Sequence, residues 1–184
     1  MDVPGGVKEI LLHTCCAPCS SAIVERLLEI EVRPVLFYFN PNIYPDTEYK
    51  KRKAECMRHA QMLGLHLIDA DYEHEGWLEA VQGLEGEPER GARCLQCFKY
   101  RLSVTASYAN NNGFKVFATT LASSRWKNLN QIREAGEAAA LLFPGLSFWA
   151  YNWRKGGLSE RRNELIIKYN FYNQSYCGCE FSNI

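Results

Sequence analysis

Eight cysteines are the residues of this 184-residue chain whose type and spacing say most about its chemistry. Seven of them form three short groups, and the eighth, Cys56, stands alone. The groups are Cys15-Cys16-Ala17-Pro18-Cys19, Cys94-Leu95-Gln96-Cys97 and Cys177-Gly178-Cys179. Close spacing lowers the conformational entropy that is lost when several thiolates gather around one metal. The groups therefore predict metal or redox chemistry, whereas Cys56 is expected to be an inert buried thiol.

The number of grouped cysteines bears on which metal they hold. A structural zinc ion and a four-iron cluster each take four ligands, so either of them leaves three cysteines over. Three thiols are enough for a second metal with an open position, and redox-active iron fits this surplus better than zinc does. Two alternatives stay open at this point, namely a thiol–disulfide redox protein that uses Cys-x-x-Cys pairs and a zinc-stapled RNA-binding module.

The composition is that of a folded protein in a reducing compartment. Hydrophobic residues make up 47% of the chain, and 23% of the residues are charged with no net charge, which excludes a disordered polyelectrolyte. No apolar run reaches the ~18–20 residues of a membrane span, and the first residues lack the basic segment of a secretory signal. We therefore expect a cytoplasmic protein with no membrane partner, whose thiols stay reduced.

Alternating strands and helices are expected to position the cysteines. Apolar runs predict strands at 9–13, 33–39, 65–68, 115–120 and 147–150, and helical spacing predicts helices at 18–30, 46–63, 77–81, 95–110, 128–141 and 159–168. Asp46 is expected to cap the second helix and Gly64 to end it. Such alternation is typical of the α/β class, a parallel sheet with helices on both faces.

Sheets of this class bind their ligands at the carboxyl ends of the strands. Cys15 and Cys16 lie in the loop after the first predicted strand, and Cys19 lies in the first turn of the next helix. We therefore expect one catalytic domain over 1–184, with a metal site at this edge of the sheet. The chain has neither a Gly-x-Gly-x-x-Gly nor a Walker motif, so ATP use is not expected.

Five segments of the chain resemble motifs of the QueH-type epoxyqueuosine reductase family. The first is His13-Thr14-Cys15-Cys16-Ala17-Pro18-Cys19, directly after the first strand. The others are Tyr38-Phe39-Asn40-Pro41-Asn42-Ile43, Pro88-Glu89-Arg90-Gly91-Ala92-Arg93-Cys94-Leu95-Gln96-Cys97, Thr119-Thr120-Leu121 and Tyr176-Cys177-Gly178-Cys179-Glu180-Phe181-Ser182. They occur in the family's order over nearly the whole chain, and the combination is far more specific than a single Cys-x-x-Cys.

The resemblance implies a fold, a reaction and two metal groups. The fold is Rossmann-like and related to the adenine-nucleotide hydrolase (HUP) group. The reaction is reduction of epoxyqueuosine to queuosine at the wobble position of a tRNA, without cobalamin. The metal groups are a 4Fe-4S cluster and an adjacent iron or other divalent metal, and the family's metal shell combines cysteines with a carboxylate. Removal of the epoxide oxygen takes two electrons, so an electron donor that the sequence does not identify is also required.

The resemblance also implies candidate ligands for the two metal groups, without dividing the cysteines between them. The cluster candidates are Cys15, Cys16, Cys94, Cys97, Cys177 and Cys179. The metal-ligand candidates are the same six residues together with Cys19 and Asp71. Cys19 stands where some relatives carry an acid, and Asp71 is the other candidate for the carboxylate position.

Several polar residues beside these motifs are candidates for proton transfer and substrate orientation. His13, Tyr38 and Tyr72, or a water held at the metal, could protonate the leaving oxygen. The alternative roles are a hydrogen bond that fixes the loop for His13 and packing for Tyr38. Asn40 and Asn42 could orient the substrate, although asparagine is also typical of turns.

The zero net charge conceals two oppositely charged halves. Residues 1–90 carry a net charge of −7, and residues 91–184 carry +7. Basic residues interleaved with tryptophans suit contact with phosphates and stacking on an unpaired base. The RNA-binding candidates are Arg125, Trp126, Lys127, Trp153 and Arg154, whereas Trp149, in a predicted strand, is expected in the core.

Overall fold

A five-stranded, wholly parallel sheet forms the centre of the molecule. The computed structural model describes residues 1–70 and 72–182, and the strands lie in the order β3-β2-β1-β4-β5. Their bounds are β1 Glu9–His13, β2 Arg33–Tyr38, β3 Leu67–Asp69, β4 Val116–Thr119 and β5 Ser147–Phe148. The predicted α/β class is confirmed, whereas the relation to the adenine-nucleotide hydrolase group stays a prediction.

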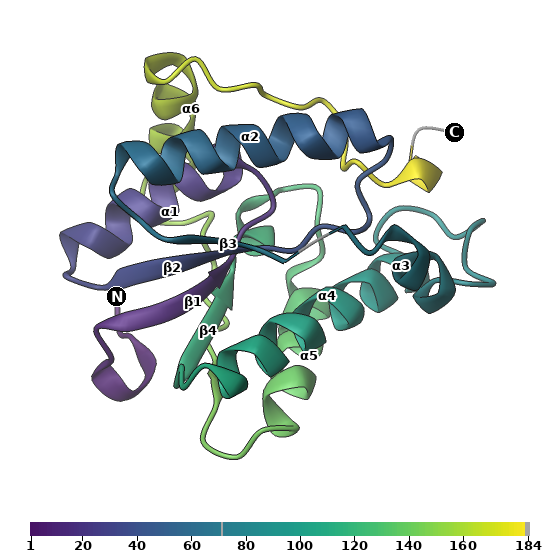
Figure 1. Ribbon diagram of the computed structural model, residues 1–184, viewed down its shortest axis with the longest axis horizontal. Helices are drawn as coiled ribbons and strands as arrows, with labels where there is room; N and C mark the ends of the chain where they lie inside the picture. Colours follow the sequence, from purple (N-terminus) through teal and green to yellow (C-terminus); the bar gives the residue numbers. More distant parts are fainter. Residues whose placement is uncertain (71, 183–184) are drawn as a thin grey trace.

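Helices cover both faces of this sheet (Figure 1). α1, α2 and α6 lie on one face, while α3, α4 and α5 lie on the other (Figure 1). Their bounds are α1 Ala17–Glu29, α2 Asp46–Met62, α3 His74–Ala80, α4 Ala92–Asn111, α5 Leu129–Leu141 and α6 Leu158–Lys168. None of the helices in the described ranges is both long enough and apolar enough to cross a membrane.

The central strand β1 shows why this sequence forms a buried sheet. Ile10, Leu11 and Leu12 are each 0% exposed. Successive side chains of a strand point to opposite faces of the sheet, and a layer of helices covers each face. Leu11 pairs with Val35 of β2 and with Phe117 of β4. A continuous apolar run without alternation is typical of a parallel strand that is covered on both faces.

The ends of two helices differ from expectation in ways that matter for the site. α4 begins at Ala92, earlier than expected, so Cys94 and Cys97 both lie on the helix. The prediction that Asp46 caps α2 is wrong, because Pro45 occupies the cap position and Asp46 pairs with Lys50 at 2.6 Å instead. Pro45 has the extended backbone that the cap position requires. Asp46 is therefore the first residue of the helix, where its carboxylate can pair with a side chain one turn later.

The order of the strands changes direction at β1, and in sheets of this class such a point forms a crevice at the carboxyl ends of the strands. β2 pairs with one edge of β1 and β4 pairs with the other, so loops on either side of β1 diverge. His13, at the end of β1, is hydrogen-bonded through Nδ1 to Oγ1 of Thr119 at the end of β4, 2.8 Å away. The first cysteine group follows directly after this point.

Candidate metal centre

Cys15, Cys16 and Cys19 form a compact group, the triad, between β1 and α1. Their sulfur atoms all lie within 4.8 Å of one another. Cys16 occupies the cap position of α1 with an extended backbone, so it stands at the positive end of the helix dipole. The hydroxyl of Thr120 contacts Cys15 twice, as acceptor for its backbone N–H at 3.1 Å and beside its sulfur at 3.4 Å. The prediction that this loop brings three thiols together is confirmed.

The triad concentrates thiolate character on one sulfur. Hydrogen bonds from Cys16 and Cys19 hold the pKa of Cys15 well below its usual value, and the charge of Lys127 lowers it further. Burial raises the pKa of Cys16, and the hydrogen bond to Cys15 raises the pKa of Cys19 to about 12. One anionic sulfur flanked by two thiol donors is an arrangement that a metal cation can convert into three thiolate ligands.

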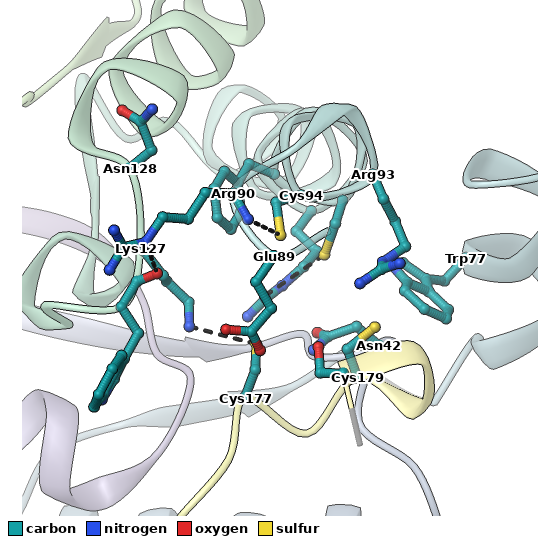
Figure 2. Close-up of a pocket in the computed structure, with 15 residues that line it drawn as sticks. Asn42, Trp77, Glu89, Arg90, Arg93, Cys94, Lys127, Asn128, Cys177 and Cys179 are labelled. Carbon is teal, nitrogen blue, oxygen red and sulfur yellow. Dashed lines mark hydrogen bonds between the residues drawn. The ribbon is translucent and has the colours of Figure 1, made fainter. Parts of the chain in front are cut away.

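The other four grouped cysteines form the quartet around a small cavity of about 30 Å³. Cys94 and Cys97 lie in the first two turns of α4 and line this cavity together with Cys177 and Cys179 from the carboxyl-terminal segment. Figure 2 shows Cys94, Cys177 and Cys179 around the cavity. The backbone N–H of Arg90 donates to the sulfur of Cys94 at 3.2 Å. Burial raises the pKa of Cys94, and it raises the pKa of Cys179 to about 11. Residues 80 positions apart in sequence thus supply four thiols to one cavity.

Arg52 of α2 holds the carboxyl-terminal pair of cysteines in place. Its side chain is 3% exposed, pairs with Glu48 at 2.6 Å and donates to the carbonyl oxygen of Cys177 at 2.9 Å. Gly178 lies against this guanidinium with a φ of +100°. The backbone N–H of Tyr44 also donates to the carbonyl of Gly178 at 2.8 Å, so the segment is fixed from two sides.

A second, larger cavity of about 580 Å³ adjoins the quartet. Cys15 and Cys19 of the triad line it, and so does Cys177 of the quartet. Asn42 and Lys127 are among the residues that line both cavities. The two groups of thiols therefore face one connected region at the carboxyl ends of the strands.

Lys127 links the two groups electrostatically. Its ammonium nitrogen lies 3.5 Å from the sulfur of Cys177, a contact drawn in Figure 2. Burial lowers the pKa of Lys127, but the negative potential of Cys177, Cys15 and Cys19 outweighs this and raises the pKa above its usual value. Lys127 is thus a cation held between quartet and triad.

The three candidate proton donors lie outside both cavities. His13 is fully buried, with Nε2 3.0 Å from the carbonyl oxygen of Phe39, and burial together with Arg101 lowers its pKa to about 3. Tyr38 is fully buried and donates to the carbonyl of Tyr49 at 3.3 Å, and burial raises its pKa.

Tyr72 has the same kind of internal partner. It donates to the carbonyl of Ile43 at 2.7 Å, and burial raises its pKa to about 12. The structure therefore places Tyr38 against α2 and Tyr72 against the loop after β2, and neither at the cavities. It places neutral His13 as a link between strands. Asp71, the candidate carboxylate ligand, lies outside the described residues.

The RNA-binding candidates divide into exposed and buried residues. Trp126 is 70% exposed at the rim of both cavities, and Arg125 beside it lines the larger one. The prediction for Trp153 is wrong, because its side chain is 1% exposed and its ring packs against Trp149, with centroids 5.2 Å apart. Arg154 donates to the carbonyl oxygen of Lys127 at 2.7 Å, so it braces the loop that carries the rim residues.

The two asparagines also differ in their surroundings. Asn40 is 0% exposed and donates to the carbonyl of Thr14 at 2.9 Å, which ties the ends of β1 and β2 together. Asn42 is 2% exposed, and its Oδ1 has no hydrogen-bond partner among the described residues. An unsatisfied buried amide that lines both cavities is suited to contact a bound group.

Sequence reasoning missed two residues that the structure brings to the thiols. Arg101 lines both cavities, and its Nη1 lies 3.9 Å from the sulfur of Cys97. Its spacing of four residues from Cys97 on a helix was a usable signal. Gln174 donates through Nε2 to the sulfur of Cys16 at 2.8 Å, and no spacing rule connects residues so distant in the chain.

Comparison with known proteins gives a consistent result. The model of the family described as Epoxyqueuosine reductase QueH matches residues 10–184. Proteins named epoxyqueuosine reductase QueH from Histophilus somni and Haemophilus influenzae are each 44% identical over 182 residues, covering 99% of this chain and 75% and 74% of theirs. The protein of that name from Thermotoga maritima is 34% identical over 176 residues, covering 94% of this chain and 89% of its own. The chain therefore belongs to the epoxyqueuosine reductase QueH family.

Proposed function

We propose that this protein reduces epoxyqueuosine to queuosine in tRNA and that it holds two metal groups for this purpose. The observation that carries the proposal is the presence of two separate sets of thiols on adjoining cavities. The quartet lines the smaller cavity, and Cys15 and Cys19 of the triad line the larger one. A tRNA substrate implies that the reaction takes place in the cytoplasm and that an electron donor supplies two electrons for each epoxide.

The donor sets fit the two groups. Four thiols around one cavity match the four ligands of a 4Fe-4S cluster. The three sulfurs of the triad lie within 4.8 Å of one another, so small rotations of the side chains would bring all three to the metal–sulfur distance of about 2.3 Å around one ion. Cys94, Cys97, Cys177 and Cys179 would hold the cluster, and Cys15, Cys16 and Cys19 would hold the second metal. When bound, the pair supplies single electrons from the cluster and Lewis-acid activation of an oxygen from the metal.

The residues around the larger cavity bind and orient the substrate in this proposal. Asn42, whose buried amide oxygen lacks a partner, is placed to accept a hydrogen bond from a polar group of the modified base. Lys127 stabilises negative charge that develops on the departing oxygen, because its ammonium group lies between triad and quartet. Lys127 lines both cavities, whereas the candidate donors Tyr38 and Tyr72 line neither.

The rim of the larger cavity provides contacts to the RNA. The ring of Trp126 is exposed beside Arg125, and Arg162 of α6 lies across the same cavity. Aromatic rings stack on unpaired bases, and arginines contact phosphates, so this rim suits an anticodon loop whose wobble base enters the cavity. The acidic half of the chain contributes fewer of these rim residues than the basic half does.

Anaerobic purification and reconstitution test the proposal. The wild-type protein should bind about four to five iron and four sulfide per chain, and it should reduce epoxyqueuosine in tRNA. Cys94→Ala and Cys177→Ala should each lose most of the sulfide and the activity, because each removes a ligand of the quartet. Cys56→Ala is the matched control, since Cys56 is 1% exposed and lines neither cavity, and it should keep both.

The same experiment separates the alternatives. A colourless protein that holds one zinc ion and takes up no iron would contradict the reductase proposal and favour a zinc-stapled RNA-binding module. Activity that survives chelators and depends on one cysteine pair would favour a thiol–disulfide redox protein. Loss of iron in Cys56→Ala would show that the ligand assignment is wrong.

A further inference from the structure

Arg101 is a buried cation that forms no ion pair with a described carboxylate. Its side chain is 2% exposed, and no ion pair joins it to a described aspartate or glutamate. Its Nε also has no hydrogen-bond partner among these residues. A buried charge is costly unless an opposite charge lies close to it. Glu89 lines the same two cavities but forms no ion pair with Arg101, so the negative charge in direct contact with the guanidinium must come from sulfur or from a group bound in the cavities.

The helix α4 directs Arg101 toward the quartet. Positions 94, 97 and 101 lie on one face of α4, so the two thiols and the guanidinium point to the same side. Nη1 donates to the sulfur of Cys97 at 3.9 Å. Nη2 donates to Oδ1 of Asn40 and lies 3.4 Å from Nε2 of His13. These contacts fix the guanidinium between the quartet and the ends of the central strands.

Two sources of negative charge could compensate Arg101, and the geometry favours one. A phosphate of the RNA would have to leave solvent and reach a side chain that is 2% exposed. The sulfur of Cys97 is already in contact and belongs to the quartet. Lys127, with its ammonium group near Cys15, Cys19 and Cys177, serves the region between the two groups of thiols. Arg101 is therefore assigned to the quartet.

We propose that Arg101 is the internal counter-charge of the iron–sulfur group in the quartet and raises the reduction potential of that group. The inference rests on the proposed function, because it takes the quartet to hold a cluster. A cluster bound by four thiolates is anionic and gains a further negative charge when it accepts an electron. A nearby cation in a medium of low dielectric constant therefore stabilises the reduced state more than the oxidised state. In this role Arg101 acts through the charge of the cluster.

A purely structural role for Arg101 makes a different prediction. Its hydrogen bonds to Asn40 and its contact with His13 depend on the shape of the guanidinium, so any substitution would disturb them equally. The proposed role depends on charge. A lysine at this position keeps the charge and loses the shape, whereas methionine and glutamine lose the charge.

The experiment compares reduction potentials of full-length reconstituted proteins, measured by anaerobic redox titration with electron paramagnetic resonance. Arg101→Met and Arg101→Gln should lower the potential by at least about 59 mV, which is a tenfold change in a one-electron equilibrium. Arg101→Lys should stay close to the wild-type value. Lys99→Met is the matched control, because Lys99 is on the same helix but pairs with Glu134 at the surface, and it should leave the potential unchanged.

Each other outcome has a clear consequence. Equal potentials in wild type and both neutral variants, or equal shifts in all three Arg101 variants, would overturn the role of the charge. Arg101→Gln keeps a hydrogen-bond donor, so it preserves the comparison if Arg101→Met does not fold. A wild-type protein that takes up no iron and sulfide would instead refute the cluster assignment itself, before any variant is measured.

Discussion

At the scale of single residues, the site is a set of thiols balanced by buried cations. Lys127 contacts Cys177, Arg101 contacts Cys97, and Arg52 binds the backbone at Cys177. Thiolates are the form of cysteine that binds metals, and a nearby cation stabilises the thiolate over the thiol. Each cation therefore lowers the free energy needed to bring several thiolates together in a buried site. The charged side chains that contact these sulfurs within the described part of the chain, Lys127 and Arg101, are accordingly basic.

Lys127→Met should lower the turnover of epoxyqueuosine in tRNA by at least about tenfold, roughly 1.4 kcal/mol of transition-state stabilisation. The physical reason is that a cation beside both groups of thiols stabilises negative charge where oxygen leaves. Single-turnover assays of the reconstituted enzyme measure the effect. Lys127→Arg should recover part of the rate, and Lys155→Met, at an exposed position, should match wild type. Equal rates in Lys127→Met and wild type would show that Lys127 has no role in the reaction.

Trp126→Ala should weaken binding of the tRNA by roughly 1–3 kcal/mol, the range for loss of one stacked base. The ring is 70% exposed at the rim of the cavities, so its removal costs little folding energy. Filter binding or fluorescence anisotropy with the modified tRNA measures the affinity. Trp126→Phe should keep most of it, and the exposed Leu142→Ala serves as control. Unchanged affinity in Trp126→Ala would show that the RNA does not stack on this ring.

At the scale of elements, two loops and two helix starts carry the thiols. The triad follows β1 and begins α1, while the first half of the quartet begins α4. Both helix starts point their N–H groups and their positive dipole ends toward sulfur. The second half of the quartet lies in no helix or long strand, so α2 and the loop after β2 must hold it through Arg52 and Tyr44.

Gly178→Ala should reduce the iron and sulfide content of the reconstituted protein. A Cβ at this position would lie 2.8 Å from Nη1 of Arg52, and a φ of +100° is strained for alanine by about 1–3 kcal/mol. The variant therefore displaces Cys177 and Cys179 from α4. Gly113→Ala is the matched control, because its φ of +79° is also positive but its Cβ would meet open space just beyond the far end of α4. It should lose stability and keep its iron, and full iron content in Gly178→Ala would contradict this account.

At the scale of the whole molecule, the site joins segments from both ends of the chain. The quartet links α4 to the carboxyl-terminal segment, and the triad comes from the first loop. The second half of the chain, with its net charge of +7, supplies Arg125, Lys127 and Arg162 to the larger cavity. Zero net charge is therefore compatible with an RNA-binding rim, because the charges are separated along the chain.

Metal loading should stabilise the carboxyl-terminal segment more than the sheet. Residues 172–182 contain few regular backbone hydrogen bonds, and ligation by Cys177 and Cys179 would tie them to α4. Hydrogen–deuterium exchange of loaded and chelated protein should show slower exchange in this segment after loading, with β1 and β2 almost unchanged. An equal slowing of exchange in the sheet and in this segment would contradict the proposal that metal ligation ties the segment to α4.

The sequence by itself determined the parallel α/β fold and the grouping of the thiols, because both are local patterns. Uninterrupted apolar runs such as 10–12 mark strands that are covered on both faces, and Cys15, Cys16 and Cys19 are close in space because they are close in the chain. Cys94 and Cys97 share one helix because α4 begins at Ala92, earlier than the predicted start at 95.

Only the tertiary structure decided which groups meet and which aromatic residues stay exposed. The pairing of Cys94 and Cys97 with Cys177 and Cys179, and the approach of Gln174 to Cys16, depend on how distant segments pack. Trp126 and Trp153 both lie in polar sequence, yet one is exposed and the other is core. Burial depends on how the whole molecule packs and not on the neighbouring residues in the chain. The sequence therefore identified the seven grouped thiols, but it did not show how they divide into triad and quartet or which buried cations lie beside them.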